Sequence, residues 1–479
     1  MKEEKESLIS KIGKFLPAVE KPSYKESFNN RLKWTGIALV SYLILSYITI
    51  YGLAPATYGQ YRFLEIVLGS RFGSLMTLGI GPIVTAGIIL QLLVGSKIID
   101  WDMSKPEERE KFQTWNKFLA ILFCFLEAGA YVLGGALPVI GGLGTTILVI
   151  LQLALGGLIV ILLDELVSKW GFGSGISLFI AAGVSTQIVI RTISPLAQTC
   201  TPLQFATCIP SAASPPVGRL WQFLMYLLGG DLYNTLITFI PLLSTVIVFL
   251  IVIYVQDISV NIPLAFSSLR GFGRTWGLKL LYTSNIPVIF AASLIASSQL
   301  ILGRIGTTPT PTGLQCGFFG CYDQRGTPVS GLVYYLSAPT DFMIKLLGAG
   351  VTSSDLIRVG IHIVLFVVLG ILFSVFWVST SGMDAKSVAE QIDSIGMQIP
   401  GYRKDPRIIE SVLNRYIPAL SVLGGAFVGL LAALADVTNA IGTGMGILLA
   451  VMIIYQYYEQ LSAENLEEAH PLVRKILGG

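Results

Sequence analysis

RFLEIVLGSRFGSLMTLGIGPIVTAG, residues 62–87, begins with a segment that is too short and too charged to cross a membrane. Arg62, Glu65 and Arg71 fall within it, and Gly79 to Pro82 then lead into an uninterrupted apolar run. A charged half-helix at membrane depth is costly unless protein or water shields it, and irregular backbone is tolerated there only beside a cavity. We therefore expect residues 62–73 to fold back into a water-filled vestibule. An amphipathic helix lying on the outer surface is the alternative.

The chain as a whole is strongly apolar. Of its 479 residues, 53% are hydrophobic and only 13% are charged, whereas about a quarter of the residues of a soluble domain are charged. This composition predicts an all-α polytopic membrane protein. The N-terminal segment 1–33 is charged and has no apolar centre, so we do not expect a cleavable signal peptide.

Apolar stretches of about 20 residues predict ten transmembrane helices. They cover residues 34–54, 77–96, 115–135, 145–166, 174–193, 235–255, 282–302, 357–379, 415–434 and 440–459. If both termini lie in the cytoplasm, the cytoplasmic segments carry 24 of the 32 lysine and arginine residues. The positive-inside rule therefore predicts an N-in, C-in topology. Loops 194–234 and 303–356 are then external and irregular, and the basic loops 256–281 and 380–414 are cytoplasmic docking surfaces.

Two pairs of segments indicate an internal repeat with inverted topology. FGSGISLFI at 172–180 opens the fifth span and resembles IGTGMGILL at 441–449, which opens the tenth. PIVTAG at 82–87 resembles PVIFAA at 287–292, again five spans apart. Inverted repeats with Gly/Pro-broken spans are typical of membrane translocation machines. Chance similarity between glycine-rich apolar helices is the alternative.

The chain shows no pattern that predicts covalent chemistry. It has no GxxxxGK[ST] nucleotide motif, no HExxH and no histidine–cysteine cluster, so we expect neither enzymatic activity nor a cofactor nor a metal. We expect His362 and Cys124 to be core residues. Cys200 with Cys208 and Cys316 with Cys321 lie in the predicted external loops, where either disulfides or free thiols are compatible with the sequence.

Aliphatic residues concentrate where the repeat-related spans begin. Ile80 and Val84 are four residues apart, as are Ile176 and Ile180, and the repeat places Ile180 opposite Leu449. An apolar constriction closes a pore by excluding water while it yields to a large passing object. Ordinary helix packing is the alternative explanation.

Five stretches resemble the SecY family, the large subunits of protein-conducting channels, and most closely its archaeal and eukaryotic branch. They are residues 77–95, 163–180, 282–294, 414–436 and 442–461, so the resemblance covers nearly the whole chain. It implies a channel through one copy of the subunit, with two hinged five-helix halves. The implied organisation is a cytoplasmic segment 1–33, a first half 34–193, an external loop 194–234, a second half 235–459 and a cytoplasmic tail 460–479.

The resemblance also implies roles for individual residues. The expected pore ring consists of Ile80, Val84, Ile176, Ile180, Ile286 and Leu449. The expected plug, which closes the external funnel, consists of Arg62, Phe63, Leu64, Glu65, Ile66, Val67, Leu68, Gly69, Ser70, Arg71 and Phe72. Candidates for polar contacts at the lateral gate, between the second and third spans and the seventh and eighth, are Thr85, Glu127 and Ser297, although Ser297 replaces an asparagine common in archaeal relatives. Candidates for ribosome docking are Arg270, Arg274, Arg403, Lys404 and Arg415.

The expected function is a passive, gated conduit that passes unfolded polypeptides and releases apolar segments sideways into lipid. The implied partners are a single-span SecE/gamma-type subunit, a small beta-type subunit, the ribosome with its nascent chain, and the signal recognition particle receptor. The implied location is the plasma membrane, as a multi-pass protein. A secondary transporter would share inverted repeats but needs polar groups at midplane. A membrane insertase that never conducts chains across is a second rival.

Overall fold

Ten helices correspond to the ten predicted spans, and five of them form the first half of the chain. The computed structural model describes residues 17–24, 26–54, 71–101, 103, 105–197, 208–211, 214–266, 273–283, 286–302, 308–309, 314–323, 328–394, 396–398 and 405–469. The first-half helices are α2 (Phe28–Tyr47), α4 (Gly81–Gly95), α5 (Pro106–Leu133), α6 (Leu143–Trp170) and α7 (Gly175–Ile193). The second-half helices are α9 (Leu232–Asp257), α10 (Ile286–Leu302), α13 (Ser353–Thr380), α15 (Pro406–Val437) and α16 (Gly444–Ala469).

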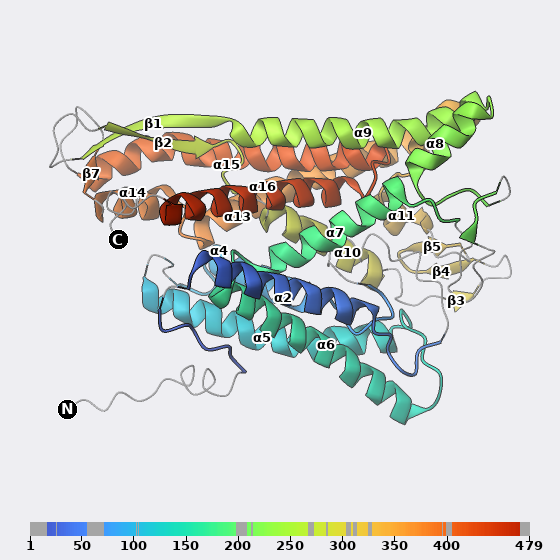
Figure 1. Ribbon diagram of the computed structural model, residues 1–479, viewed down its shortest axis with the longest axis horizontal. Helices are drawn as coiled ribbons and strands as arrows, with labels where there is room; N and C mark the ends of the chain where they lie inside the picture. The colour runs from blue at the N-terminus through green and yellow to red at the C-terminus, as the bar shows by residue number, and fades with distance from the viewer. Residues whose placement is uncertain are drawn as a thin grey trace.

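The two halves lie side by side. Helices α2, α5 and α6 form one flank and α9, α15 and α16 the other, with α4, α7 and α10 between them (Figure 1). Six helices are long and apolar enough to cross a membrane within the described residues, namely α5, α6, α7, α9, α13 and α15. Helix α4 and residues 286–295 of α10 are apolar but shorter. The ten-helix fold predicted from the sequence is therefore confirmed.

Large apolar side chains also cover the outer surfaces of these helices. Val246, Ile247, Phe249 and Leu250 of α9, for example, are all exposed. A helix that is apolar on every side belongs inside a large core or a lipid bilayer. Because these apolar side chains face outwards, they are suited to contact with lipid rather than with water.

The loops at the two ends of the bundle are more regular than predicted. At one end, β1 (Ser259–Phe266) pairs with both β2 (Gly273–Lys279) and β7 (Met397–Gln398), so the two predicted cytoplasmic loops share one sheet beside α14 (Ala385–Ser394). At the opposite end lies α8 (Arg219–Leu228), together with a sheet of β3 (Thr308–Pro309), β4 (Gln315–Gly317), β5 (Gly320–Tyr322) and β6 (Pro328–Gly331) (Figure 1). The short helices α11 (Leu332–Leu336), α12 (Phe342–Ile344) and η3 (Lys345–Ala349) follow that sheet.

Glycines let α13 and α15 pack backbone to backbone. A Cβ atom added at Gly429 would lie 2.4 Å from the carbonyl oxygen of Phe366, and one at Gly425 would lie 2.6 Å from that of Gly370. Gly425 and Gly429 are four residues apart and so share one face of α15. Small residues at this spacing are a common way for membrane helices to approach closely, and here they join α13 to α15.

Candidate functional site

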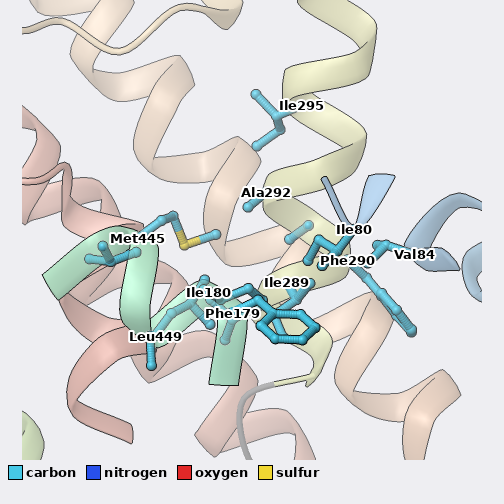
Figure 2. Close-up of a cluster of buried hydrophobic side chains, with 14 of the residues drawn as sticks. Ile80, Val84, Phe179, Ile180, Ile289, Phe290, Ala292, Ile295, Met445 and Leu449 are labelled. Carbon is cyan, nitrogen blue, oxygen red and sulfur yellow. The ribbon is translucent and has the colours of Figure 1, made fainter. Parts of the chain in front are cut away.

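Four helices bring the ends of distant segments together at the centre of the molecule. Helices α4, α7, α10 and α16 begin at residues 81, 175, 286 and 444, and α10 packs against both α4 and α16, while α16 packs against α7. In Figure 2, Ile80 and Val84 approach from one side, Met445 and Leu449 from the other, and Ile180 lies between them. The four helices therefore contribute one shared cluster of aliphatic side chains.

Four of the predicted ring residues, Ile80, Val84, Ile180 and Leu449, lie together at this point (Figure 2). Ile80, Ile180 and Leu449 have no exposed surface, and Val84 is 3% exposed. Ile176 and Ile286 are partly buried and pack against the large hydrophobic core that contains these four. The structure thus places side chains from both halves, up to 369 residues apart in sequence, within one apolar centre.

Sequence reasoning missed several other members of the cluster. Met445, Ile289, Ala292 and Ile295 are also buried in it (Figure 2). The repeat contained a signal for Met445, because FGSGI and IGTGM align it with Ile176. It also contained a signal for Ile289, because PIVTAG and PVIFAA align it with Val84. Ala292 and Ile295 had no such signal.

A carboxylate caps each of the two repeat-related helices α7 and α16. Asp164 of α6 accepts a hydrogen bond from the backbone N–H of Ile176 at 2.9 Å. Asp436 of α15 accepts one from the N–H of Gly444 at 2.6 Å. The first N–H groups of a helix have no partner within the helix, so a side-chain acceptor stabilises its start. The same type of contact at equivalent places supports the inverted repeat and fixes where α7 and α16 begin.

His362 lies in the core, as expected, but its surroundings are polar on one side. It is 1% exposed, and its Nε2 lies 3.4 Å from the Oδ2 of Asp436. Its other ring nitrogen has no hydrogen-bond partner among the described residues. Through Asp436, His362 connects α13 to the junction of α15 and α16.

The predicted gate residues do not all meet. The Thr85 hydroxyl of α4 donates a 2.7 Å hydrogen bond to Glu127 of α5. Both helices belong to the first half, so this bond joins neighbours on one side of the predicted gate rather than bridging it. Ser297 lies in α10, and its side chain falls outside the described part of the structure.

Glycines and aromatic rings mark the contact of α4 with α10 and α13. A Cβ atom at Gly87 would lie 3.8 Å from the ring of Phe290, and one at Gly95 would lie 2.9 Å from that of Phe376. The Phe290 ring also packs against Phe373 and Trp377 of α13, with centroids 5.9 and 6.2 Å apart. Sequence reasoning missed this contact, because the spacing of glycines in α4 does not say which ring faces them.

Most of the predicted plug and part of the docking set cannot be placed. Residues 62–70, Arg270, Arg403 and Lys404 lie outside the described residues. Of the predicted plug, Arg71 is exposed and Phe72 is buried, with its ring stacked on Tyr131 at 5.8 Å. In the docking set, Arg274 lies in β2 opposite Leu264 of the antiparallel strand β1, and Arg415 is exposed on α15.

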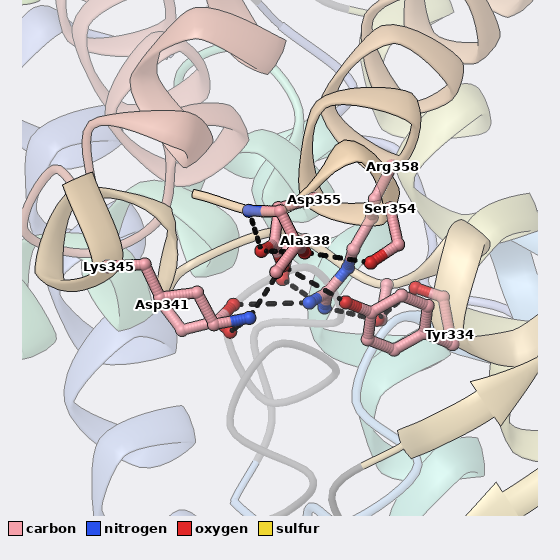
Figure 3. A network of polar contacts seen from close by, with 9 residues as sticks. Tyr334, Ala338, Asp341, Lys345, Ser354, Asp355 and Arg358 are labelled. Atoms are coloured by element: carbon pink, nitrogen blue, oxygen red, sulfur yellow. Dashed lines mark hydrogen bonds and ion pairs between the residues drawn. The ribbon is translucent and has the colours of Figure 1, made fainter. Parts of the chain in front are cut away.

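An ionic network fastens the predicted external loop to the start of α13 (Figure 3). Lys345 lies 2.6 Å from Asp355 and 2.8 Å from Asp341, and Arg358 lies 3.1 Å from Asp341. Hydrogen bonds from Lys345 hold the pKa of Asp355 below its ordinary value, and those to Asp341 and Asp355 raise the pKa of Lys345. Both carboxylates therefore remain ionised in this loop at neutral pH.

The cysteines of the predicted external loops form disulfides where the structure describes them. Cys316 is bonded to Cys321, and Cys208 is also disulfide-bonded, while Cys200 lies outside the described residues. Cys124 is free and buried, as expected. No group of three or more His, Cys, Asp or Glu side chains within the described ranges is placed to hold a metal ion.

Comparison with known proteins gives one consistent result. The family model described as SecY matches residues 74–458. The chain is 40% identical to the protein translocase subunit SecY of Pyrococcus furiosus, over 98% of this chain and 99% of that protein. It is 42% identical to the subunit of the same name from Methanocaldococcus jannaschii, over 96% and 97% of the two chains.

Solved structures agree with the sequence comparison. A structure described as that of a protein conducting channel superimposes with a TM-score of 0.78 at 42% identity, covering 97% of this chain and 98% of the other. Sec61 in the canine ribosome–channel complex from the endoplasmic reticulum gives a TM-score of 0.75 at 42% identity, with the same coverage.

Proposed function

The chain belongs to the SecY family, and on that premise we propose that it is the central, pore-forming subunit of a protein translocation channel. Unfolded polypeptides pass through the middle of the molecule, between the two five-helix halves. Sufficiently apolar segments leave sideways into the membrane. The protein is a multi-pass membrane protein, and its action requires binding and movement rather than covalent chemistry.

The observation that carries this proposal is the central aliphatic cluster. Ile80, which directly precedes α4, Ile180 of α7 and Leu449 of α16 are completely buried and lie in one cluster (Figure 2). A constriction of aliphatic side chains excludes water and ions at rest. It offers a passing chain no polar site that would bind one sequence in preference to another, so it suits a substrate of variable sequence.

Lateral release uses the contact of α4 with α10 and α13. Gly87 and Gly95 face the apolar rings of Phe290 and Phe376, so an apolar segment that displaces these rings breaks no hydrogen bond made by them. Burial of apolar surface favours transfer of such a segment into lipid by about 25 cal/mol per Å². A signal sequence that inserts here would separate the halves and free the segment that we assign as the plug, residues 62–72.

The end of the bundle that carries β1, β2 and β7 is the proposed cytoplasmic docking face. The sheet joins two loops that are more than 100 residues apart in sequence, and Arg274 and Arg415 lie on or near it. Cationic side chains on such loops suit the phosphates of ribosomal RNA. The further proposed partners are a SecE/gamma-type subunit, a beta-type subunit and the signal recognition particle receptor. Both termini would lie in the cytoplasm, and the location would be the plasma membrane.

The transporter and the insertase both require features that differ from the central aliphatic cluster. A transporter needs polar groups at the membrane midplane, where α4, α7 and α16 present aliphatic ones. An insertase has no use for a closed constriction between the halves. Neither rival is favoured by a specific observation on the described residues.

Reconstituted vesicles test the proposed function directly. The purified subunit, with its membrane partners, should allow a ribosome-bound secretory precursor to become protected from added protease, while a precursor without its signal sequence stays digestible. Protection of a membrane protein's spans without any protection of secretory domains would favour the insertase instead. Saturable uptake of a small solute without protection of any precursor would favour a transporter.

A further inference from the structure

A cavity of about 650 Å³ lies away from the aliphatic constriction, at the predicted external end of the molecule. The end of α7, the start of α8, the start of α9 and the turn 439–441 form its walls. Helix α7 belongs to the first half, whereas α9 and the turn belong to the second. Cavities of this size hold small-molecule ligands in many proteins, and none of the roles assigned above uses this one.

Within the part of the chain that the structure describes, the charged side chains that line the cavity are all positive. Arg191, in the last turn of α7, and Arg219, the first residue of α8, both line it, and no aspartate or glutamate is among the described lining residues. The sequence has no acidic residue from 166 to 230. Burial lowers the pKa of Arg219, which reflects the cost of keeping its charge away from water. Asp231, the next acid along the chain, is exposed and bound by Asn234.

Backbone hydrogen bonds hold the start of α8 close to the end of α7, so that both arginines line the same cavity. The backbone N–H of Gly218 donates to Ser194 at 2.9 Å, and that of Val217 donates to Leu196 at 2.7 Å, so the start of α8 is attached just beyond the end of α7. Gln222 is 5% exposed; it accepts a hydrogen bond from Arg219 at 3.2 Å and donates to the carbonyl of Pro216 at 2.6 Å. The Arg219 guanidinium is therefore oriented before any ligand arrives, which reduces the entropy cost of binding.

Helix α8 also places the cavity at the depth of lipid head groups. Arg219, Gln222 and Tyr226 lie at helical spacing on the face that lines the cavity. The opposite face carries exposed apolar side chains, which are Leu220, Trp221, Leu224, Leu227 and Leu228. A helix divided in this way lies in the membrane interface with its apolar face towards the acyl chains, and tryptophan is common at that depth.

We propose that this cavity binds the phosphate group of an anionic phospholipid of the outer leaflet, with Arg191 and Arg219 as its ligands. Guanidinium groups bind phosphate through paired, charge-assisted hydrogen bonds. The amides of Gln187 and Asn439, which also line the cavity, are suited to the glycerol hydroxyls of a head group. A lipid bound here would contact both halves at the side where the chain crosses from one to the other. Placing the cavity in the outer leaflet rests on the proposed topology.

Binding of short-chain lipids to the full-length protein in a neutral detergent tests this site. The thermal midpoint is followed against the concentration of dihexanoyl phosphatidylglycerol, since a ligand that binds only the folded state raises it. The double variant Arg191→Gln/Arg219→Gln should bind about tenfold or more weakly, because it loses the charge-assisted hydrogen bonds. The matched control Lys386→Gln/Arg407→Gln removes two exposed charges elsewhere and should bind like the wild type. Equal binding by the wild type and both double variants overturns the proposal.

Two further ligands identify the source of the phosphate. Dihexanoyl phosphatidylcholine, which carries no net charge, should bind more weakly than phosphatidylglycerol, and glycerol 1-phosphate should bind weakest because it lacks acyl chains. If glycerol 1-phosphate binds as tightly as the lipid and depends on the same arginines, the lipid assignment is overturned in favour of a soluble phosphate ester.

A second measurement needs no variant and so does not depend on how the arginine substitutions fold. The wild-type protein is incorporated into vesicles that contain a phosphatidylglycerol with a photo-reactive head group, and the adducts are mapped by mass spectrometry. Adducts within residues 187–191 and 215–226 support the site. Adducts spread over the bundle surface without enrichment there overturn it. Neither assay measures translocation, so failure here leaves the channel assignment untouched.

Discussion

Replacing one aliphatic side chain of the constriction by serine should make the resting channel leak ions. Ile80, Ile180 and Leu449 are completely buried. Exposing one such side chain to water costs about 1.5–3 kcal/mol, so wetting all three costs about 5–9 kcal/mol. Ile180→Ser removes one of these contributions, about 2 kcal/mol, and should raise the wetted fraction about 30-fold.

Conductance across a planar bilayer, with purified protein and no ribosome, measures this leak. Ile180→Val keeps the site aliphatic and should stay as tight as the wild type. Leu153→Ser provides the matched control, because Leu153 is also completely buried but lies on α6. It should destabilise the fold by a similar amount without leak. An Ile180→Ser channel as tight as the wild type, or a Leu153→Ser channel that leaks equally, would refute the reasoning.

Three further predictions concern packing, pH and the α4–α5 contact. Gly429→Ala should cost about 1–3 kcal/mol of stability by overpacking, because its Cβ would lie 2.4 Å from a carbonyl oxygen of α13. The control Gly360→Ala, whose Cβ would have no atom within 4 Å, should not lower the thermal midpoint. Equal losses of thermal midpoint in the two variants would contradict the packing argument. The folded-state pKa of Asp355 is lowered, so the stability it contributes is present above its unfolded pKa of about 4 and is lost as the pH falls below that value. Asp355→Asn should therefore lower the midpoint at neutral pH and make its decline in acid shallower; parallel curves would argue against the network. Thr85→Val should lower the free energy of unfolding by about 1–3 kcal/mol, because it leaves a carboxylate oxygen of Glu127 unpaired. Thr85→Ser keeps the hydroxyl group and should not lower it. Identical thermal midpoints for the two variants would show that the hydrogen bond contributes little.

Hydrophobic length predicted the helices well because it is a local property of the sequence. Each predicted span has its helix, and the Gly-rich motifs at residues 172–175 and 441–444 indeed precede α7 and α16. The starts of helices were less well predicted. Helix α4 begins at Gly81 rather than at residue 77, since the turns that connect it to the preceding segment are as apolar as the helix itself.

The spacing of residues along the sequence did not predict which distant segments contact each other. The sequence offered Thr85 and Glu127 as gate residues, but only the structure shows that they bond to each other within the first half. The four-stranded sheet β3–β6 depends on pairings such as that of Cys316 with Cys321, and a Ser/Thr/Pro-rich loop gives little periodic signal for such pairings. Arg191 and Arg219 line one cavity because the backbone of residues 217–218 bonds to that of residues 194–196, and no local pattern predicts this contact.

Crosslinking from the constriction to a translocating chain tests the central claim most directly. A photo-reactive residue is placed at Ile80, Ile180 or Leu449, and ribosomes stalled partway through a secretory protein are supplied. The account predicts adducts between the nascent chain and all three positions, lost when the signal sequence is deleted. Docked ribosomes that give no adducts at any of the three positions would contradict a polypeptide path through this centre.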